Sequence, residues 1–321
     1  MKRFASIVLS VPAVVAGIGT AAAQNYPERP IRIVCPFPPG GSSDFGARIL
    51  SQNLPALLKQ TVVIDNRGGA GGNIGTDIAA KAAPDGYTLL ATSEGPITVS
   101  PSLYPRLPYA PATDLIGITQ FIKYTHVVVI NPTVKVGNIK ELIALAKGGK
   151  MSYAHPGVGT SNHLAVEQFK LMTHTDITSV SYKGGGPAIV SVIGNETQVS
   201  FATAPSAIPH VKSGKLKAIA ITAGKRSTVL PDLPTIAESG VPGYAIEGWV
   251  GLLAPAKTPA PIVQRLYEET VKVMKLKEVQ DIVFSGGSEV AYTPPGQTQG
   301  LLRDEGAMWA KVIKATGIKG E

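Results

Sequence analysis

Cysteine is nearly absent from this chain of 321 residues, in which Cys35 is the single example. One cysteine cannot form an internal disulfide, so a disulfide-stabilised scaffold and a metal site built from several thiolates are both excluded. Histidine is also scarce, with five residues and no H-E-x-x-H pattern, which argues against a histidine metal site. The sequence therefore predicts no metal and no cofactor.

Charged residues are few as well, at 16% of the chain, and aromatic residues reach only 6%. The formal net charge is +8, but the basic residues are scattered and form no block. A dispersed surplus of this kind favours long-range attraction of small anions. It argues against nucleic-acid binding, which needs a concentrated basic surface.

Long apolar runs are missing except near the N-terminus. There, Lys2 and Arg3 precede the uncharged stretch Ile7–Gly17, which is followed by Ala21–Ala23. This order is typical of a secretory signal peptide, predicted over residues 1–23 with cleavage after Ala23, and it predicts a periplasmic location. A membrane anchor is the alternative, but the stretch is broken by a proline and is shorter than the ~20 residues that span a bilayer.

Short β-branched runs alternate with helical patterns along the rest of the chain. This alternation predicts an α/β fold with largely parallel strands. Strands are expected at Ile31–Pro36, Thr61–Asp65, Tyr87–Thr92, Asp114–Phe121, His126–Ile130, Ser152–Ala154, Thr178–Ser181, Val199–Phe201 and Leu216–Thr222. Helices are expected at Asp44–Leu58, Ile74–Ala83, Ile139–Lys147, Ser161–Met172, Pro187–Ile193, Pro261–Lys275 and Pro295–Ala315.

The length of the mature chain, roughly 300 residues, suits two domains better than one. The simplest arrangement is two α/β lobes joined by more than one crossing strand, with a ligand cleft between them. We expect residues 24–124 and 249–321 to form the first lobe and residues 125–248 to form the second.

The chain does not match the catalytic and nucleotide-binding motifs that we considered. No G-x-S-x-G motif occurs, and the glycine-rich segment Gly68–Gly75 fits neither the dinucleotide fingerprint nor a P-loop. Ser161 and His163 lie close together in sequence and suggest a nucleophile with its base. The simpler interpretation is that Ser161 caps the following helix, with His163 in its first turn.

Three loops rich in glycine and serine each follow a predicted strand and open a helix: Phe37–Asp44, His155–Ser161 and Tyr182–Ala188. Such loops let backbone N–H groups approach a ligand, and a helix N-terminus favours negative charge. The first two loops contain no lysine or arginine, which favours a carboxylate over a polyphosphate. Each loop alone could be an ordinary helix-capping turn, but three together favour a ligand site.

Asp44 needs a separate explanation, because a carboxylate beside a bound carboxylate would repel it. Its position at the start of a helix lets it accept backbone N–H bonds and hold the first loop in shape.

The sequence resembles the Bug proteins, the extracytoplasmic solute receptors of tripartite tricarboxylate transporters. The resemblance covers nearly the whole mature chain and is carried by these blocks in order: Pro36–Asp44, Asn66–Gly75, Ala83–Leu90, Gly157–Leu164, Tyr182–Ala188, Gly214–Leu216, Leu233–Gly240 and Gly248–Gly251.

The resemblance implies a periplasmic-binding-protein fold whose two lobes close on a small carboxylate, and delivery of that ligand to the membrane subunits of a transporter. It also implies that loops of both lobes grip one carboxylate group. The ligand-binding residues expected on these grounds are Phe37, Pro39, Gly40, Gly41, Ser42, Ser43, Asp44, Ser93, Gly157, Gly159, Thr160, Ser161, His163, Tyr182, Gly185, Pro187, Thr203 and Ala204.

Two departures from the family pattern bear on the ligand. Family members often carry an acidic residue after the strand at Val199–Phe201, where this chain has Ala202–Ala204, so a plain carboxylate is favoured over an amino acid. The aromatic residue often found after Trp249 is Val250 here, which bears on pocket size. We expect a monomeric, non-catalytic binding protein. The alternatives are a periplasmic carboxylate sensor and a hydrolase that uses Ser161 and His163.

Overall fold

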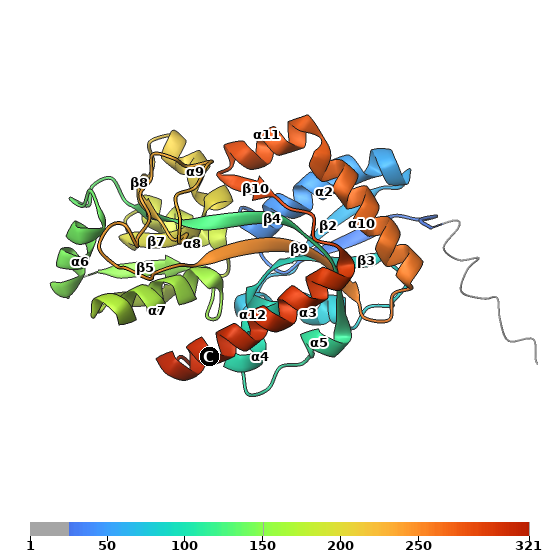
Figure 1. Ribbon diagram of the computed structural model, residues 1–321, viewed down its shortest axis with the longest axis horizontal. Helices are drawn as coiled ribbons and strands as arrows, with labels where there is room; N and C mark the ends of the chain where they lie inside the picture. The colour runs from blue at the N-terminus through green and yellow to red at the C-terminus, as the bar shows by residue number, and fades with distance from the viewer. Residues whose placement is uncertain (1–25, 150, 321) are drawn as a thin grey trace, which may run out of the picture.

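Two α/β lobes lie side by side and share two long strands, β4 (Leu115–Ile130) and β9 (Glu247–Pro255), which run between them (Figure 1). The computed structural model describes residues 26–149 and 151–320, so the predicted signal peptide lies outside the described part. Within that part, no helix is long and apolar enough to cross a membrane. The predicted two-lobed α/β architecture is confirmed, whereas the lobe limits remain a prediction.

The sheet of the first lobe has the strand order β2-β1-β3-β9-β4. Strands β1 (Ile31–Cys35), β2 (Val62–Asn66) and β3 (Thr88–Ser93) are parallel, whereas β9 is antiparallel to both of its neighbours. A short strand, β10 (Ser288–Val290), pairs with β4 at the edge. Helices α2 (Ser42–Leu58), α10 (Ala260–Lys275) and α11 (Lys277–Ser285) share one apolar cluster with this sheet. Helices α3 (Asn73–Ala80) and α12 (Pro295–Thr316) contribute to a second.

The second lobe continues the sheet through β4 in the order β4-β7-β5-β6, with β8 (Lys217–Ile221) also paired to β4. Its strands β5 (Ser152–His155), β6 (Thr178–Ser181) and β7 (Val199–Thr203) are parallel to one another. Helices α6 (Ile139–Lys147) and α7 (Ser161–Thr173) share one apolar cluster, and α8 (Gly185–Ile193) and α9 (Ala204–Lys212) share another. The end of α12 also joins the α6–α7 cluster through Trp309 and Ile313. The remaining helical segments are short: η1 (Ala70–Gly72), η2 (Gly95–Val99), α4 (Ser100–Leu103) and α5 (Pro111–Asp114).

Strand β4 connects the lobes because it changes partner along its length. Thr125 pairs with Glu247 of β9, and the next residue, His126, pairs with Thr203 of β7. The separate strands predicted at Asp114–Phe121 and His126–Ile130 are therefore wrong in one respect, since they form one strand of 16 residues. The residues between them pair with β9, for example Thr125 with Glu247, 122 residues later in the chain. Periodicity within a strand does not reveal so distant a partner.

Candidate functional site

A small cavity lies between the lobes, where β1, β3, β5 and β7 end. Its volume is about 30 Å³, which exceeds the ~10–15 Å³ that a cavity needs to hold one water molecule. In this closed arrangement, in which loops of the two lobes are in contact, the cavity has room for a group of carboxylate size. The cavity is lined by Phe37, Gly41, Ser42, Ser43, Ser93, Pro156, Thr160, Asn162, Gly185, Ala188, Ser200, Ala202, Thr203 and Ser206.

Four helices begin at this cavity. Helices α2 and α8 begin at or beside lining residues Ser42 and Gly185, and α7 and α9 follow the N-cap residues Thr160 and Thr203. Free backbone N–H groups and the positive end of the helix dipole favour an anion at each such terminus. None of the lining residues is charged. Any anion here is therefore stabilised by backbone amides and neutral side chains alone.

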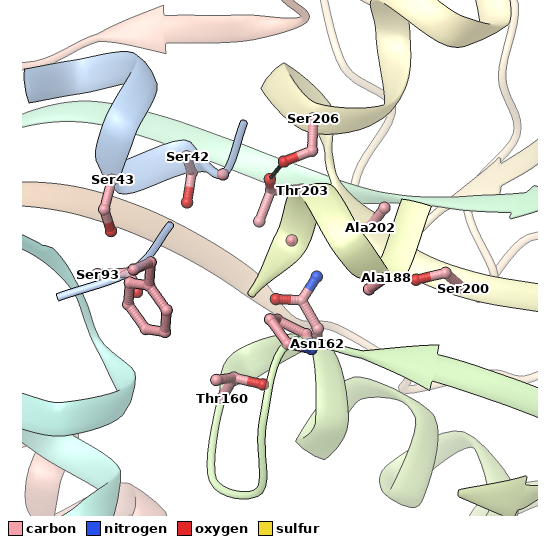
Figure 2. Close-up of a pocket in the computed structure, with 14 residues that line it drawn as sticks. Ser42, Ser43, Ser93, Thr160, Asn162, Ala188, Ser200, Ala202, Thr203 and Ser206 are labelled. Carbon is pink, nitrogen blue, oxygen red and sulfur yellow. Dashed lines mark hydrogen bonds between the residues drawn. The ribbon is translucent and has the colours of Figure 1, made fainter. Parts of the chain in front are cut away.

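Hydroxyl groups from both lobes face the same space (Figure 2). Several of these hydroxyls already have protein partners. Thr160 Oγ1 donates to the Gly157 carbonyl at 2.7 Å, Ser200 Oγ donates to the Ala154 carbonyl at 2.8 Å, and the hydroxyls of Thr203 and Ser206 are joined by a bond of 2.7 Å. Ser43 is different, because its Oγ is buried and has no hydrogen-bond partner. A buried hydroxyl without a partner is costly, so Ser43 has a donor available for a ligand.

Asp44 lies behind the first loop rather than in the cavity. Its Oδ2 accepts from the backbone N–H of Gly40 at 3.1 Å and from Arg48 Nε at 2.8 Å, and its Oδ1 accepts from Asn66 at 3.1 Å. Asn66 also donates to the carbonyl of Phe37 at 2.8 Å. These bonds tie both ends of the loop to β2 and fix the start of α2.

The loops of the two lobes meet through glycines, so that backbone packs on backbone. A Cβ placed on Gly186 would lie 2.7 Å from the carbonyl oxygen of Pro39, and one placed on Gly157 would lie 2.9 Å from the Cα of Gly71. Gly184 is similarly close to Pro38, with 2.6 Å between its Cβ position and the proline Cδ. The two lobes can therefore approach this closely only because these glycines have no Cβ atom.

The sequence-predicted residues fall into three groups. The cavity is lined by Phe37, Gly41, Ser42, Ser43, Ser93, Thr160, Gly185 and Thr203. A neighbouring cavity of about 380 Å³ shares Phe37 and Pro156 with the first, and is lined by the predicted residues Gly157 and Tyr182. The remaining predicted residues line neither cavity: Pro39, Gly40, Asp44, Gly159, Ser161, His163, Pro187 and Ala204.

Two expectations about helix starts are corrected. Helix α7 is capped by Thr160, not Ser161, because the Thr160 side chain accepts the backbone N–H of His163. Helix α8 begins at Gly185, so Pro187 is its third residue and not its first. The expectation that Val250 bears on pocket size is not supported, because its side chain lies in the core of the first lobe and does not line the cavity.

Ser161 is not paired with His163. Its Oγ is bonded to His126 Nε2 at 2.8 Å, whereas the ring of His163 packs against His155, with 4.6 Å between ring centroids. Burial lowers the pKa of His126 to about 3 and that of His163 to about 4, so both rings are neutral and weak bases at neutral pH. The geometry gives no support to the hydrolase alternative.

Sequence reasoning missed the lining residues Ser200 and Ser206, and it missed Glu94 altogether. Glu94 follows β3, is fully buried, and accepts from Tyr124 Oη at 3.3 Å and from the backbone N–H of Trp249 at 3.3 Å. A lone carboxylate directly after a buried strand, in the run Thr92–Ile97, was the signal that could have found it. On the other side of Trp249, the indole Nε1 donates to Glu305 of α12 at 2.8 Å.

Glu305 should make the stability of the protein depend on pH. Burial raises its pKa from 4.5 to about 7, and the charge of Glu94 adds to the shift. The stability contributed by the protonated form is fully present below pH 4.5 and is lost as pH rises to 7. We expect this group to lower the free energy of unfolding by about 2 kcal/mol between pH 5 and pH 8, less than the full shift because Glu305 is only partly buried. Glu305→Gln should flatten that slope in urea denaturation, and an unchanged slope would contradict it.

Comparison with known proteins identifies the family. Residues 46–318 match the family described as the tripartite tricarboxylate transporter family receptor. The chain is 38% identical over 316 residues to protein BugT of Bordetella pertussis, covering 97% of each chain. It superposes on the periplasmic binding protein BugD with a TM-score of 0.88 at 33% identity, covering 92% of this chain and 100% of BugD. It superposes equally well on R. palustris Rpa4515 with adipate (TM-score 0.88, 32% identity), covering 92% of this chain and 99% of that chain. The chain therefore belongs to the receptor family of tripartite tricarboxylate transporters, of the Bug type, and has the periplasmic-binding-protein fold.

Proposed function

We propose that this protein captures a small organic carboxylate between its lobes in the periplasm and delivers it, as a monomer, to the membrane subunits of a tripartite tricarboxylate transporter. The ligand class comprises mono-, di- and tricarboxylates with an aliphatic or aromatic body. One observation carries the proposal: four helix N-termini converge on a cavity with no charged side chain. That environment stabilises one anionic group through backbone donors.

The neutral lining also limits what the other end of the ligand can be. An ammonium group would need a carboxylate partner, and the loop where the family pattern often has an acidic residue reads Ala202–Ala204 here. A plain carboxylate leaves no such charge unpaired. The two-lobed relative with adipate supports this class, because adipate is an unsubstituted dicarboxylate.

Ser43→Ala tests the site because it should change stability and ligand affinity in opposite directions. Without ligand, we expect stability to stay the same or rise slightly, because a buried hydroxyl without a partner is removed. Carboxylate affinity should fall about tenfold, the effect of losing one hydrogen bond to a charged group. Isothermal titration with adipate, malate, citrate and benzoate measures the affinity, and native mass spectrometry of freshly purified protein identifies a co-purified acid.

The control for this variant is Ser51→Ala, which lies on the exposed side of the same helix and bonds only to the carbonyl of Arg48. It should leave affinity unchanged. If Ser43→Ala binds every acid as tightly as the unmodified protein does, the cavity between the lobes is not the binding site.

A further inference from the structure

Glu94 occupies the boundary between the lobes directly behind the cavity. Ser93, the residue before it, lines the cavity, and Gly95, the residue after it, packs against the second lobe. A Cβ on Gly95 would lie 3.2 Å from the carbonyl oxygen of Gly159. Glu94 is 0% exposed, so this boundary contains a carboxyl group that water does not reach.

Polar contacts link Glu94 to two of the four helix starts at the cavity, those of α2 and α7. Tyr124 of β4 donates to Glu94 and also interacts with Ser42, the first residue of α2. Ser161, the first residue of α7, lies within hydrogen-bonding reach of Glu94 and is bonded to His126 of β4 at 2.8 Å. We call Glu94, Tyr124, Ser161 and His126 the Glu94 cluster. It is assembled from both lobes, so it is complete only when they are closed.

The hydrogen-bond partners of Glu94 are all neutral: a phenol, a hydroxyl and backbone amides. An ionised Glu94 would therefore lie close to a bound carboxylate with no cation between them, in a region sealed from water. Two carboxylates in such a setting do not both stay ionised, and one of them takes up a proton. The hydroxyl of Ser161 accommodates either form, because it can donate to Glu94 or accept from it.

We propose that Glu94 binds a proton when the lobes close on a carboxylate, so that ligand capture is coupled to proton uptake. This inference rests on the proposed function. When the lobes are apart, water reaches Glu94 and favours its ionised form. Closure removes this water. Burial already raises the pKa of Glu94 in the closed arrangement, against the opposing effect of the Ser161 hydrogen bond.

Other titratable groups face the cluster and must be separated from it. These are Tyr124 and His126 of β4, and Glu305 of α12 beyond Trp249. Burial raises the pKa of Tyr124 well above its usual range and lowers that of His126 to about 3, so neither titrates between pH 6 and pH 8.5. Helix α7, α2 and β9 contribute Ser161, Ser42 and Trp249, which do not titrate. Glu305 does titrate in this range, so it is the group to remove as a control.

The test is isothermal titration of the full chain with adipate and with citrate at pH 7.5, in two buffers of different ionisation enthalpy. The difference in apparent enthalpy gives the number of protons taken up per ligand. We expect uptake approaching one proton for the unmodified protein, and affinity that falls by up to tenfold per pH unit between pH 7 and pH 8.5. Glu94→Gln should lose the uptake and the pH slope while binding at least as tightly at pH 8.5. Glu305→Gln should retain the uptake.

Ser161→Ala provides a second variant if Glu94→Gln does not fold. It removes the hydrogen bond that lowers the pKa of Glu94, so the proton uptake should be retained and should extend to higher pH. Uptake that ends at the same pH as in the unmodified protein would contradict its assignment to Glu94. Binding of either acid without proton uptake by the unmodified protein overturns the inference but leaves the proposed function standing. Equal uptake by the unmodified protein and Glu94→Gln also overturns it. Failure of the unmodified protein to bind both acids overturns the inference and counts against the proposed function as well.

Discussion

Replacing Gly186 with alanine should lower carboxylate affinity by on the order of 100-fold or more, about 3 kcal/mol, while leaving the unliganded protein folded. The added Cβ would lie 2.7 Å from the carbonyl oxygen of Pro39 in the other lobe, and neither backbone can move without displacing its loop. Gly186 lies in the first turn of α8 with ordinary backbone angles, so alanine does not strain the helix itself. The substitution therefore opposes closure specifically.

The matched control is Gly296→Ala in the first turn of α12, where nothing lies within 4 Å of the added methyl group. It should leave affinity and melting temperature unchanged. Small-angle X-ray scattering with adipate reports closure directly, and we expect Gly186→Ala to stay open at ligand concentrations that close the control. Compaction of both variants at the same concentration would mean that the lobes close by another route.

Asp44→Ala should destabilise the protein by on the order of 2–4 kcal/mol and weaken ligand binding with it. The substitution removes the carboxylate that accepts from the N–H of Gly40 and from the amide of Asn66, so the first loop loses two of the contacts that shape it. The affinity should fall because the backbone donors of that loop are no longer held in position. Urea denaturation and titration with adipate measure the two effects.

Arg48 forms an ion pair with Asp44, so replacing it removes the charge interaction while the bonds of Asp44 to Gly40 and Asn66 stay in place. Arg48 is about half exposed, with 51% of its side chain accessible, so Arg48→Ala should cost less than ~1 kcal/mol. If Asp44→Ala is no worse than Arg48→Ala, the loop is held by something other than the bonds to Gly40 and Asn66.

Local signals predicted the parts of the site that depend on local chemistry. Glycine, serine and threonine in the loop after β1 and at the starts of α7 and α8 pointed to Ser43, Thr160 and Gly185, which line the cavity. Helix α9 was not predicted, because Pro205 and Pro209 conceal its periodicity. For the same reason the fourth helix N-terminus at the cavity and Ser206 were not predicted either.

Features that depend on contacts between distant segments could not be predicted. Ser161 was expected at the ligand, yet its Oγ turns to His126, 35 residues earlier in the chain. Glu94 meets Trp249, which is 155 residues away. No periodicity or motif specifies such pairs, since each depends on how β4 and β9 bring the lobes together.

The position of β9 has a consequence for how the chain reaches its native state. This strand lies between β3 and β4 in the sheet, yet it follows the whole second lobe in sequence. A nascent chain that ends before residue 247 has no strand to fill the centre of the first sheet, so β3 and β4 would be left with unpaired edges. The first lobe therefore cannot finish folding before the second, although N-terminal domains usually fold first during synthesis. The sheet of the first lobe is complete only after residues 247–255 have been synthesised and have paired with β3 and β4. Because these contacts join segments far apart in sequence, we expect the chain to fold slowly.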